Sequence, residues 1–110
     1  MDRSQNLPKD LRIVRYKPMN WIVYESKSQQ RFFVSYYYES GHFQGNLVLE
    51  LNADEISKYK HHPQDLLNGQ SKLISSNFIA YDRERNIEEF SKLVDSSRLI
   101  QEWKNEKPDR

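Results

Sequence analysis

Apolar and polar residues alternate in short runs along the first half of the chain, which is the pattern of β-strands. Runs rich in β-branched and aromatic residues cover residues 11–16, 20–26, 31–38 and 46–51. Turn-prone residues separate these runs, and residues 39–45 hold two of the three glycines. Because the connections are short, the sequence predicts an antiparallel meander in which each strand pairs with the next.

Beyond Leu51 the signals become those of helices. Asn52 and Glu55 have the spacing of a capping box, so a helix is expected to begin there and to end at about His61, before a proline. A single further helical turn is expected over residues 63–69, closed by an Asn-Gly pair.

The C-terminal part also shows helical spacing. Residues 86–89 repeat the capping pattern, and Ile87, Phe90 and Val94 follow along one stripe. This helix is expected to bend near residues 95–97, where Ser or Asp can cap a second helix. Residues 72–82 fit either a strand or a helix, and the Ser and Asn residues at their centre favour a fifth strand.

The third predicted strand carries large side chains on both of its faces. One face has an unbroken apolar and aromatic row: Phe32, Val34, Tyr36 and Tyr38. The other face has a mixed row: Arg31, Phe33, Ser35, Tyr37 and Glu39. We expect the first row to form the core beneath the C-terminal helix. Two interpretations of the mixed row stay open, a second small core covered by the middle helices or residues 72–82, and an exposed binding surface.

The fold class expected from this order is α+β, with an antiparallel four- to five-stranded sheet packed against C-terminal helices. The length fits one domain over residues 1–110, with flexible ends at 1–9 and 105–110. Charged residues make up 30% of the chain, but the 13% of aromatic residues argue for a folded core. Since the chain has no cysteine, no signal-like apolar run and no membrane-length segment, we expect a cytoplasmic protein.

Charge limits the kinds of partner. The net charge is +1, without the strong positive excess of a protein that binds phosphate backbones by charge. A local basic excess between Lys9 and Arg31 leaves an alternative function open, in which a basic and aromatic sheet face binds nucleic acid. The basic residues of that alternative are Arg12, Arg15, Lys17 and Arg31.

Histidines are the remaining source of catalytic or metal chemistry. His61 and His62 are adjacent, so their side chains diverge on a helix instead of sharing a metal ion. His42 lies close to Glu39 and Ser40 in the glycine-containing loop, whereas catalytic groups usually come from separate elements. We therefore expect no catalytic residues, no metal, no cofactor and no enzyme activity.

In size, composition and layout, the chain resembles the small cytoplasmic immunity proteins of bacterial toxin systems, such as those of contact-dependent growth inhibition. The resemblance implies a protein that binds a cognate toxin domain, often a nuclease, and occludes the toxin's active site. These proteins share no motif, so no residue role carries over. This chain departs from the nuclease-directed members, which tend to be acidic, in being nearly neutral.

The residues expected to contact a protein partner come from the mixed face and from the acidic segment 82–89. Aromatic side chains would anchor the contact, and charged side chains would steer and align it. The predicted partner-binding residues are Tyr24, Arg31, Phe33, Tyr37, Glu39, Glu84, Glu88 and Glu89. The identity of the partner and the oligomeric state stay open at this point.

Overall fold

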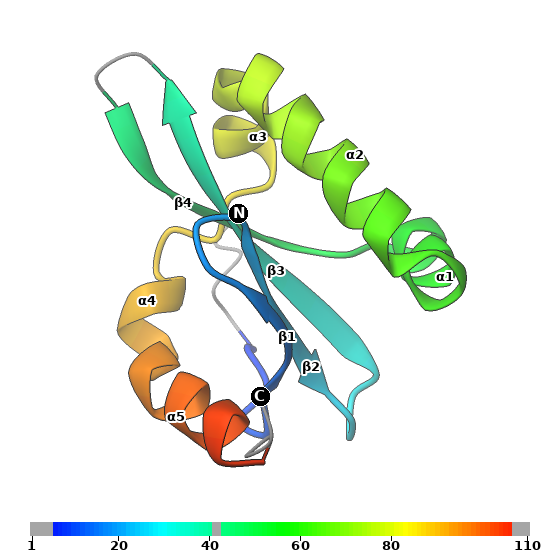
Figure 1. Cartoon of the computed structure of the whole chain (residues 1–110), viewed down its shortest axis with the longest axis vertical. Coiled ribbons are helices and arrows are strands. Elements are labelled where there is room, and N and C mark those ends of the chain that lie inside the picture. Colours follow the sequence, from blue (N-terminus) through cyan, green and yellow to red (C-terminus); the bar gives the residue numbers. More distant parts are fainter. Residues whose placement is uncertain (1–5, 41–42, 107–110) are drawn as a thin grey trace.

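A four-stranded antiparallel sheet lies between two groups of helices in the computed structural model, which describes residues 6–40 and 43–106 (Figure 1). The strands pair in chain order: β1 (Arg12–Lys17), β2 (Trp21–Ser26), β3 (Arg31–Ser40) and β4 (Phe43–Glu50). The helices are α1 (Ala53–His61), α2 (Pro63–Ser76), α3 (Phe78–Glu84), α4 (Phe90–Leu93) and α5 (Ser96–Glu106). The predicted meander and the α+β class are confirmed.

The first face of the sheet packs against α1, α2 and α3. We define this face by the row of β3 that contains Phe32, Val34 and Tyr36, all of which are buried. Helices α1 and α2 contribute the residues that cover it: Tyr59, Leu66, Leu67 and Ile74. The prediction that the C-terminal helix covers this row is wrong: α1, α2 and α3 supply the apolar side chains that pack on it, and α5 packs on the other face.

The second face packs against α4 and α5. Phe33 is fully buried here, and the ring of Phe90 lies 5.0 Å from that of Tyr24 and 6.0 Å from that of Phe33. Leu99 of α5 joins the same cluster. Around these rings the mixed row is therefore a second core, although α4 and α5 cover it instead of the middle helices.

Helix α2 is longer than the sequence predicts. It continues through Gly69, where a glycine costs about 1 kcal/mol relative to alanine. The buried side chains of Leu67 and Ile74 on either side offset that cost. The preference for a strand over residues 72–82 is wrong for the same reason: Ile74, Phe78 and Tyr81 have helical spacing and pack on the first face.

Two of the predicted helix caps are present and one is not. Asn52 Oδ1 accepts a hydrogen bond from Glu55 N, and Glu55 Oε1 accepts one from Asn52 N, both at 2.9 Å. The expected bend separates α4 from α5, and Asp95 accepts a hydrogen bond from Arg98 N in the first turn of α5. Asn86 caps no helix, since its side chain accepts from Val48 N and donates to Asp82.

Residues 85–89, which we call the crossing segment, carry the chain from the first face to the second over the outer edge of β4. Ile87 N donates to Val48 O at 2.8 Å. Arg85 donates to Glu50 O at 2.7 Å and to both carboxylate oxygens of Glu55 at 2.7 Å. The crossing is therefore fixed to β4 and to α1 at once.

A polar network extends from this ion pair into the first core. The Tyr36 hydroxyl donates to Gln70 Oε1 at 2.6 Å, and Gln70 Nε2 donates to Glu55 Oε2 at 2.9 Å. Burial raises the pKa of Tyr36 far above its usual range. Burial acts to raise the pKa of Glu55, but hydrogen bonds from Arg85, from Asn52 N and from Gln70 outweigh it, so this pKa lies below the ordinary value of a glutamate.

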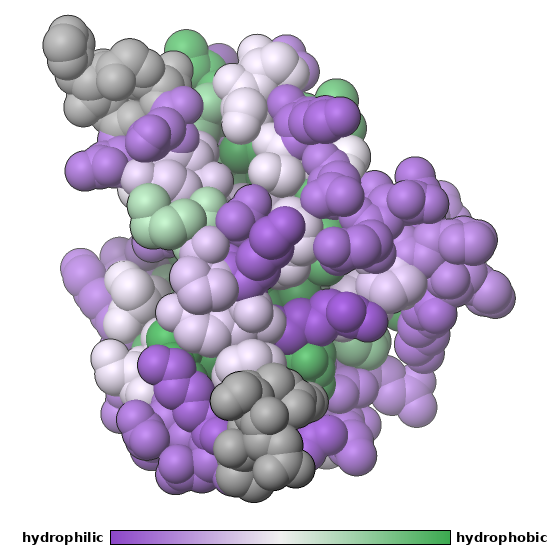
Figure 2. All heavy atoms as spheres, in the orientation of Figure 1, coloured by the Kyte–Doolittle hydropathy of each residue, from purple (hydrophilic) through white to green (hydrophobic). Residues whose placement is uncertain are grey.

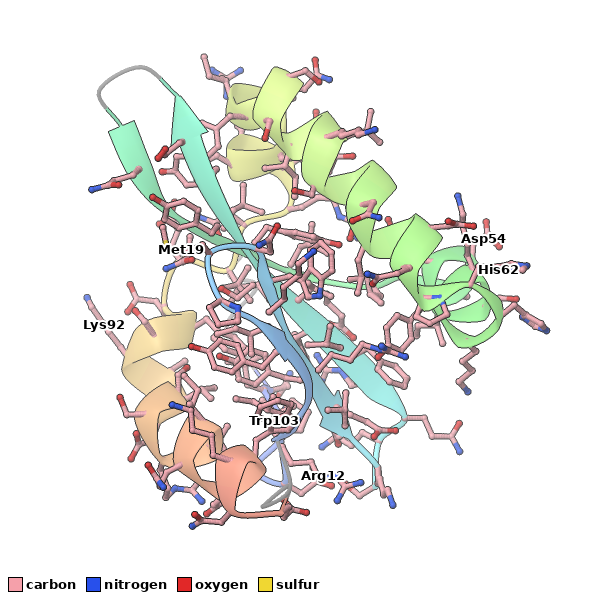
Figure 3. The ribbon with its side chains drawn as sticks, viewed as in Figure 1. Arg12, Met19, Asp54, His62, Lys92 and Trp103 are labelled. Atoms are coloured by element: carbon pink, nitrogen blue, oxygen red, sulfur yellow. The ribbon has the colours of Figure 1, made fainter. Side chains whose placement is uncertain are left out.

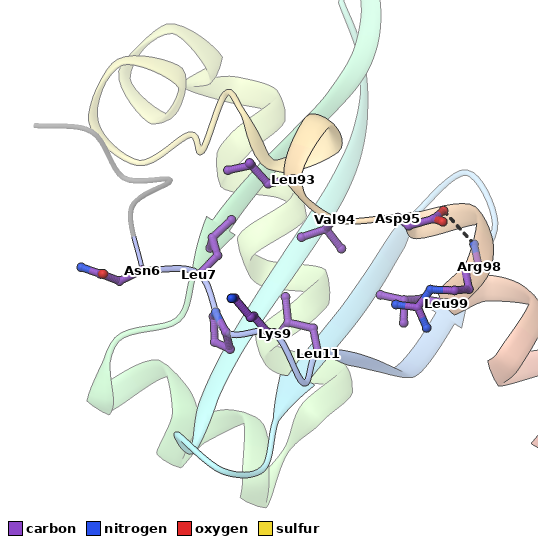
Figure 4. A pocket seen from close by; sticks show the side chains of 10 residues that line it. Asn6, Leu7, Lys9, Leu11, Leu93, Val94, Asp95, Arg98 and Leu99 are labelled. Carbon is purple, nitrogen blue, oxygen red and sulfur yellow. Dashed lines mark hydrogen bonds between the residues drawn. The ribbon is translucent and has the colours of Figure 1, made fainter.

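Both ends of the described chain pack against the second core. Leu7, Leu11, Leu93 and Leu99 line a hollow of about 430 Å³ there, and Lys9 and Arg98 also line it (Figure 4). Within the ends predicted to be flexible, Leu7 is half-buried and Pro8 buried, while Asn6 and Lys9 are exposed. Residues 105 and 106 belong to α5, and residues 1–5 and 107–110 lie outside the described residues.

The surface is largely polar. Figure 2 shows a mostly hydrophilic face with small apolar patches between charged side chains. In the part of the chain that the structure describes, every helix is too short or too polar to cross a bilayer.

We expect Glu55→Gln to lower the free energy of unfolding at pH 7 by about 2 kcal/mol, because it leaves Arg85 without its carboxylate. Because the pKa of Glu55 is lower in the folded protein than in the unfolded chain, its ionised carboxylate stabilises the fold at any pH above the unfolded-state pKa. This stabilisation is lost as the pH falls through the folded-state pKa. As the pH falls below the ordinary pKa of a glutamate, the wild type should therefore lose more stability than the variant. Urea unfolding at a series of pH values measures both effects.

The matched control is Glu102→Gln, which removes an exposed ion pair with Arg98 on α5. It should change stability by less than about 0.5 kcal/mol. Identical pH profiles for the wild type and Glu55→Gln would contradict the role given to Glu55.

Candidate functional site

Two of the three aromatic side chains predicted to anchor a partner lie inside the protein. Phe33 is fully buried and Tyr24 is 1% exposed. The Tyr24 hydroxyl shares a hydrogen bond with Ser96 Oγ at 2.9 Å, and burial raises the Tyr24 pKa. While α4 and α5 cover this face, neither ring can touch a partner, so the exposed-surface interpretation does not hold for them.

Arg31 has its partners within the fold. Its guanidinium forms two hydrogen bonds to the Glu50 carboxylate, both at 2.8 Å, and lies 5.1 Å from the centre of the Phe33 ring. It also donates to Asn6 O at 2.7 Å. The hydrogen bonds with Glu50 raise the Arg31 pKa. The sequence predicted a contact with a partner for Arg31, whereas the structure shows it holding the N-terminal segment against the sheet.

Tyr37 and Glu39 lie on a projecting part of the sheet. The last strand pair between β2 and β3 is Trp21 with Tyr36, next to which Tyr37 N still donates to Asn20 O at 2.9 Å. Residues 37–40 of β3 have their strand partners in residues 43–46 of β4 alone. We call these two segments the hairpin arm, which is seen at the upper left of Figure 1.

The second face of the hairpin arm is open. Glu39, Gln44 and Asn46 are exposed there, and Tyr37 is half-buried. The Tyr37 hydroxyl donates to Gln44 Oε1 at 2.8 Å, which fixes the ring on the strand surface. Desolvation, and then the charge of Glu39, raises the Tyr37 pKa. The arm therefore presents an ordered ring beside a carboxylate.

The first face of the hairpin arm is held by an aromatic pair. The ring of Tyr38 lies across Gly45, and its centre is 4.2 Å from that of Phe78 on α3. A Cβ atom at position 45 would lie only 3.1 Å from the Tyr38 hydroxyl oxygen. Gly45 thus permits the close approach that fixes the arm to α3.

A hollow of about 840 Å³ adjoins this aromatic pair. Residues 75–80 line it together with Tyr38, Arg83 and Glu84. Within it Ile79 is 72% exposed, which is unusual for so large an apolar side chain. The hollow therefore offers apolar surface next to the first face of the arm.

Acidic side chains gather around the hairpin arm. Glu39 stands opposite Gln44 in the β3–β4 register, Glu84 lines the hollow beside Tyr38, and Glu88 lines a crevice of about 410 Å³ that Asn46 also lines. Glu89 lies 3.5 Å from Lys92, which balances its charge. Of the residues predicted from the sequence, the structure therefore brings four together around the arm: Tyr37, Glu39, Glu84 and Glu88.

The residues of the nucleic-acid alternative are arranged differently from the prediction. Arg15 lies 5.7 Å from the centre of the Tyr59 ring and donates to its hydroxyl, and Lys17 lies 5.0 Å from the centre of the Trp21 ring. Both rings are less than a tenth exposed. Recognition of single strands uses rings on which bases can stack, and these rings are covered by the cations and by the core.

Groups suited to a metal ion do not gather within residues 6–40 and 43–106: no cluster of three or more His, Asp or Glu side chains lies there. His61 Nδ1 lies 2.8 Å from Ser57 O of its own helix. The predicted grouping of His42 with Glu39 and Ser40 falls partly outside the described residues.

Comparison of the chain with protein-family models, with curated proteins and with solved structures finds no match.

Several residues of the arm surface were not singled out from the sequence. They are Gln44, Asn46, Phe78 and Ile79. The available signal was Gly45, which stands between Gln44 and Asn46 just before the apolar run that begins at Leu47, since a glycine inside a strand marks a close approach of another group.

We expect Gly45→Val to destabilise the wild type, because the new side chain displaces Tyr38 from Phe78. In a Tyr38→Ala background the same change should stabilise the strand, because valine favours strands over glycine. The two changes should be coupled by about 1 kcal/mol or more in a double-mutant cycle measured by urea unfolding.

Gly69→Ala is the control, since nothing lies within 4 Å of its Cβ position. It should stabilise the protein by roughly 0.5–1 kcal/mol. Additive effects at positions 38 and 45 would show that Tyr38 does not constrain Gly45.

Proposed function

We propose that this protein is a binding module that neutralises a cognate toxin domain by covering the toxin's active site, and that the hairpin arm makes the contact. One observation carries the proposal. The arm extends past β1 and β2 with its second face open, while β2 and residues 32–36 of β3 are covered on both faces.

The composition of the arm surface supports a contact with protein. Tyrosine is enriched at protein interfaces, and covering an exposed apolar side chain is favourable. Here Tyr37 lies on the second face of the arm, and the exposed Ile79 lies on α3 beside its first face. Because Tyr38 stacks on Phe78, the arm is held in one position before any partner arrives. A preorganised surface loses less conformational entropy on binding than a mobile one.

The charges of the arm favour a positively charged target. Glu39, Glu84 and Glu88 surround it, although the whole chain carries a net charge of only +1. A cationic cleft is what a nuclease offers its substrate, and clustered carboxylates speed association with such a cleft. A nuclease domain is therefore the target that fits this surface.

We expect Tyr37→Ala to weaken the binding of the toxin domain by about 30-fold, corresponding to about 2 kcal/mol, because it removes the central ring. Glu88→Ala should slow association several-fold at low salt, with a smaller effect at high salt. Isolating the tagged protein from its native extract at moderate salt, and identifying the bound protein, supplies the partner for both measurements.

Growth assays then test neutralisation. The isolated partner should arrest growth when it is produced alone, and co-production of the wild type should restore growth more fully than Tyr37→Ala does. Asp54→Asn is the matched control for the acidic residues, since Asp54 lies on α1 at the opposite side of the molecule from the arm (Figure 3). The proposal fails if the bound protein is harmless, or if only nucleic acid is recovered and is lost as salt rises.

A further inference from the structure

The two edges of the sheet differ in how well they are protected against pairing with another strand. The outer edge of β1 is irregular, because the register shifts between Ile13 and Arg15. It also carries exposed cations at Arg12, Arg15 and Lys17. A bulge and charged side chains are the usual obstacles to strand addition, so β1 is a blunted edge.

The outer edge of β4 is protected along only part of its length. Val48 N and Val48 O bond to the crossing segment, so the backbone groups of Val48 point outward. Alternate residues of a strand point their backbone groups the same way, which directs those of Gln44 and Asn46 outward too. Among the described residues, nothing hydrogen-bonds to these outward N–H and C=O groups. This edge is therefore open beside the hairpin arm.

The crossing segment shows that the edge accepts an extended partner. Ile87 N donates to Val48 O at 2.8 Å, and the Asn86 side chain takes the place of a carbonyl at Val48 N. These two contacts imitate one position of a fifth strand. The positions at Asn46 and Gln44 continue the same edge towards the end of the arm.

We propose that an extended, basic segment of the partner adds to this edge as a fifth strand alongside Gln44 and Asn46. This inference rests on the proposed function and names the part of the toxin domain that the protein holds. Backbone hydrogen bonds would supply affinity, and alternate side chains would supply specificity.

The surroundings of the edge define the chemistry of that segment. Side chains of an added strand point alternately to the two faces of the sheet. On the second face they lie near Glu88 and one strand away from Glu39, which favours the long basic side chains of Lys and Arg. On the first face they meet the hollow lined by Phe78 and Ile79, which favours apolar side chains, with Arg83 and Glu84 also lining that hollow. The fitting segment therefore alternates basic and apolar residues.

A second copy of this chain fits the edge less well. Pairing of β4 with β4 would bring together two copies of the same acidic surface, each with Glu39 and Glu88 near the edge. Surfaces of like charge repel each other. The distribution of charge therefore selects a basic partner over self-association.

A proline at position 46 tests the inference directly. Asn46→Pro removes the outward N–H and places the ring where the added strand would lie. Because this N–H points away from β3, the change leaves the β3–β4 hydrogen bonds in place, and proline is tolerated at such edge positions. Asn46→Ala is the matched control, since it shortens the side chain and keeps the N–H. Gln44→Pro is a second variant with the same logic, and circular dichroism verifies that each variant is folded.

The probe is a peptide of about nine residues in which Lys and Val alternate, with a Glu and Val peptide as its counterpart. The wild type and Asn46→Ala should bind the basic peptide equally, and both proline variants should bind it about tenfold more weakly or worse. Binding should slow hydrogen exchange at the Gln44 and Asn46 amides by about tenfold. The acidic peptide should not bind.

Equal binding by the proline variants, binding of the acidic peptide, or a homodimer that Asn46→Pro dissociates would each overturn the inference. The toxin assay separates this result from the proposed function. If Asn46→Pro neutralises the isolated toxin as well as the wild type does, the edge is not used while the function stands. If the wild type neutralises nothing but holds the basic peptide at this edge, the edge is a binding site and the toxin assignment fails.

Discussion

The packing of helices on both faces of the sheet depends on the hydrogen bonds and the ion pair that Arg85 forms at the sheet edge. Its guanidinium joins the Glu55 carboxylate of α1 to the Glu50 carbonyl of β4, at the point where the chain leaves one helical layer for the other. Ile87 follows with a backbone bond to β4. With the crossing held there, a chain of 110 residues covers both faces of one sheet.

Covering both faces determines where the protein can meet a partner. Large aromatic side chains of the sheet, such as Phe33 and Tyr36, are buried in the two cores and cannot contact a partner. Apart from the blunted edge of β1, what remains accessible is the length of β3 and β4 that projects beyond the other strands. The same layout explains why the surface there combines exposed backbone, a half-buried tyrosine and carboxylates: α3 reaches the first face of the arm, but α4 and α5 do not extend far enough to bury its second face.

The parts of the fold that could be predicted are those set by local interactions. The four strands, the Asn52 capping box and the break at Asp95 all depend on residues close together in sequence. The choice of helical layer for each face is decided by distant contacts, and both sheet faces are apolar enough to accept either layer. Residues 72–82 carry both periodicities, and packing on the first face selects the helical one.

The candidate site was predicted in part. Tyr37, Glu39, Glu84 and Glu88 lie around the hairpin arm, and their exposure follows from polarity and position. Tyr24 and Phe33 lie on the same face of the sheet as Tyr37, so the alternation of apolar and polar residues could not show which part of that face is buried and which is open. The separation depends on where β2 ends and on how far α4 reaches, which are properties of the assembled fold.

The crossing segment also separates the part of the chain that is synthesised first from the part that is synthesised last. Residues up to 84 contain the whole sheet and the layer on its first face, so those parts can meet before α4 and α5 emerge. Until then Phe33 and Tyr24 face water on an uncovered sheet. During synthesis the growing chain therefore exposes an aggregation-prone apolar surface, which is buried only when α4 and α5 pack on it.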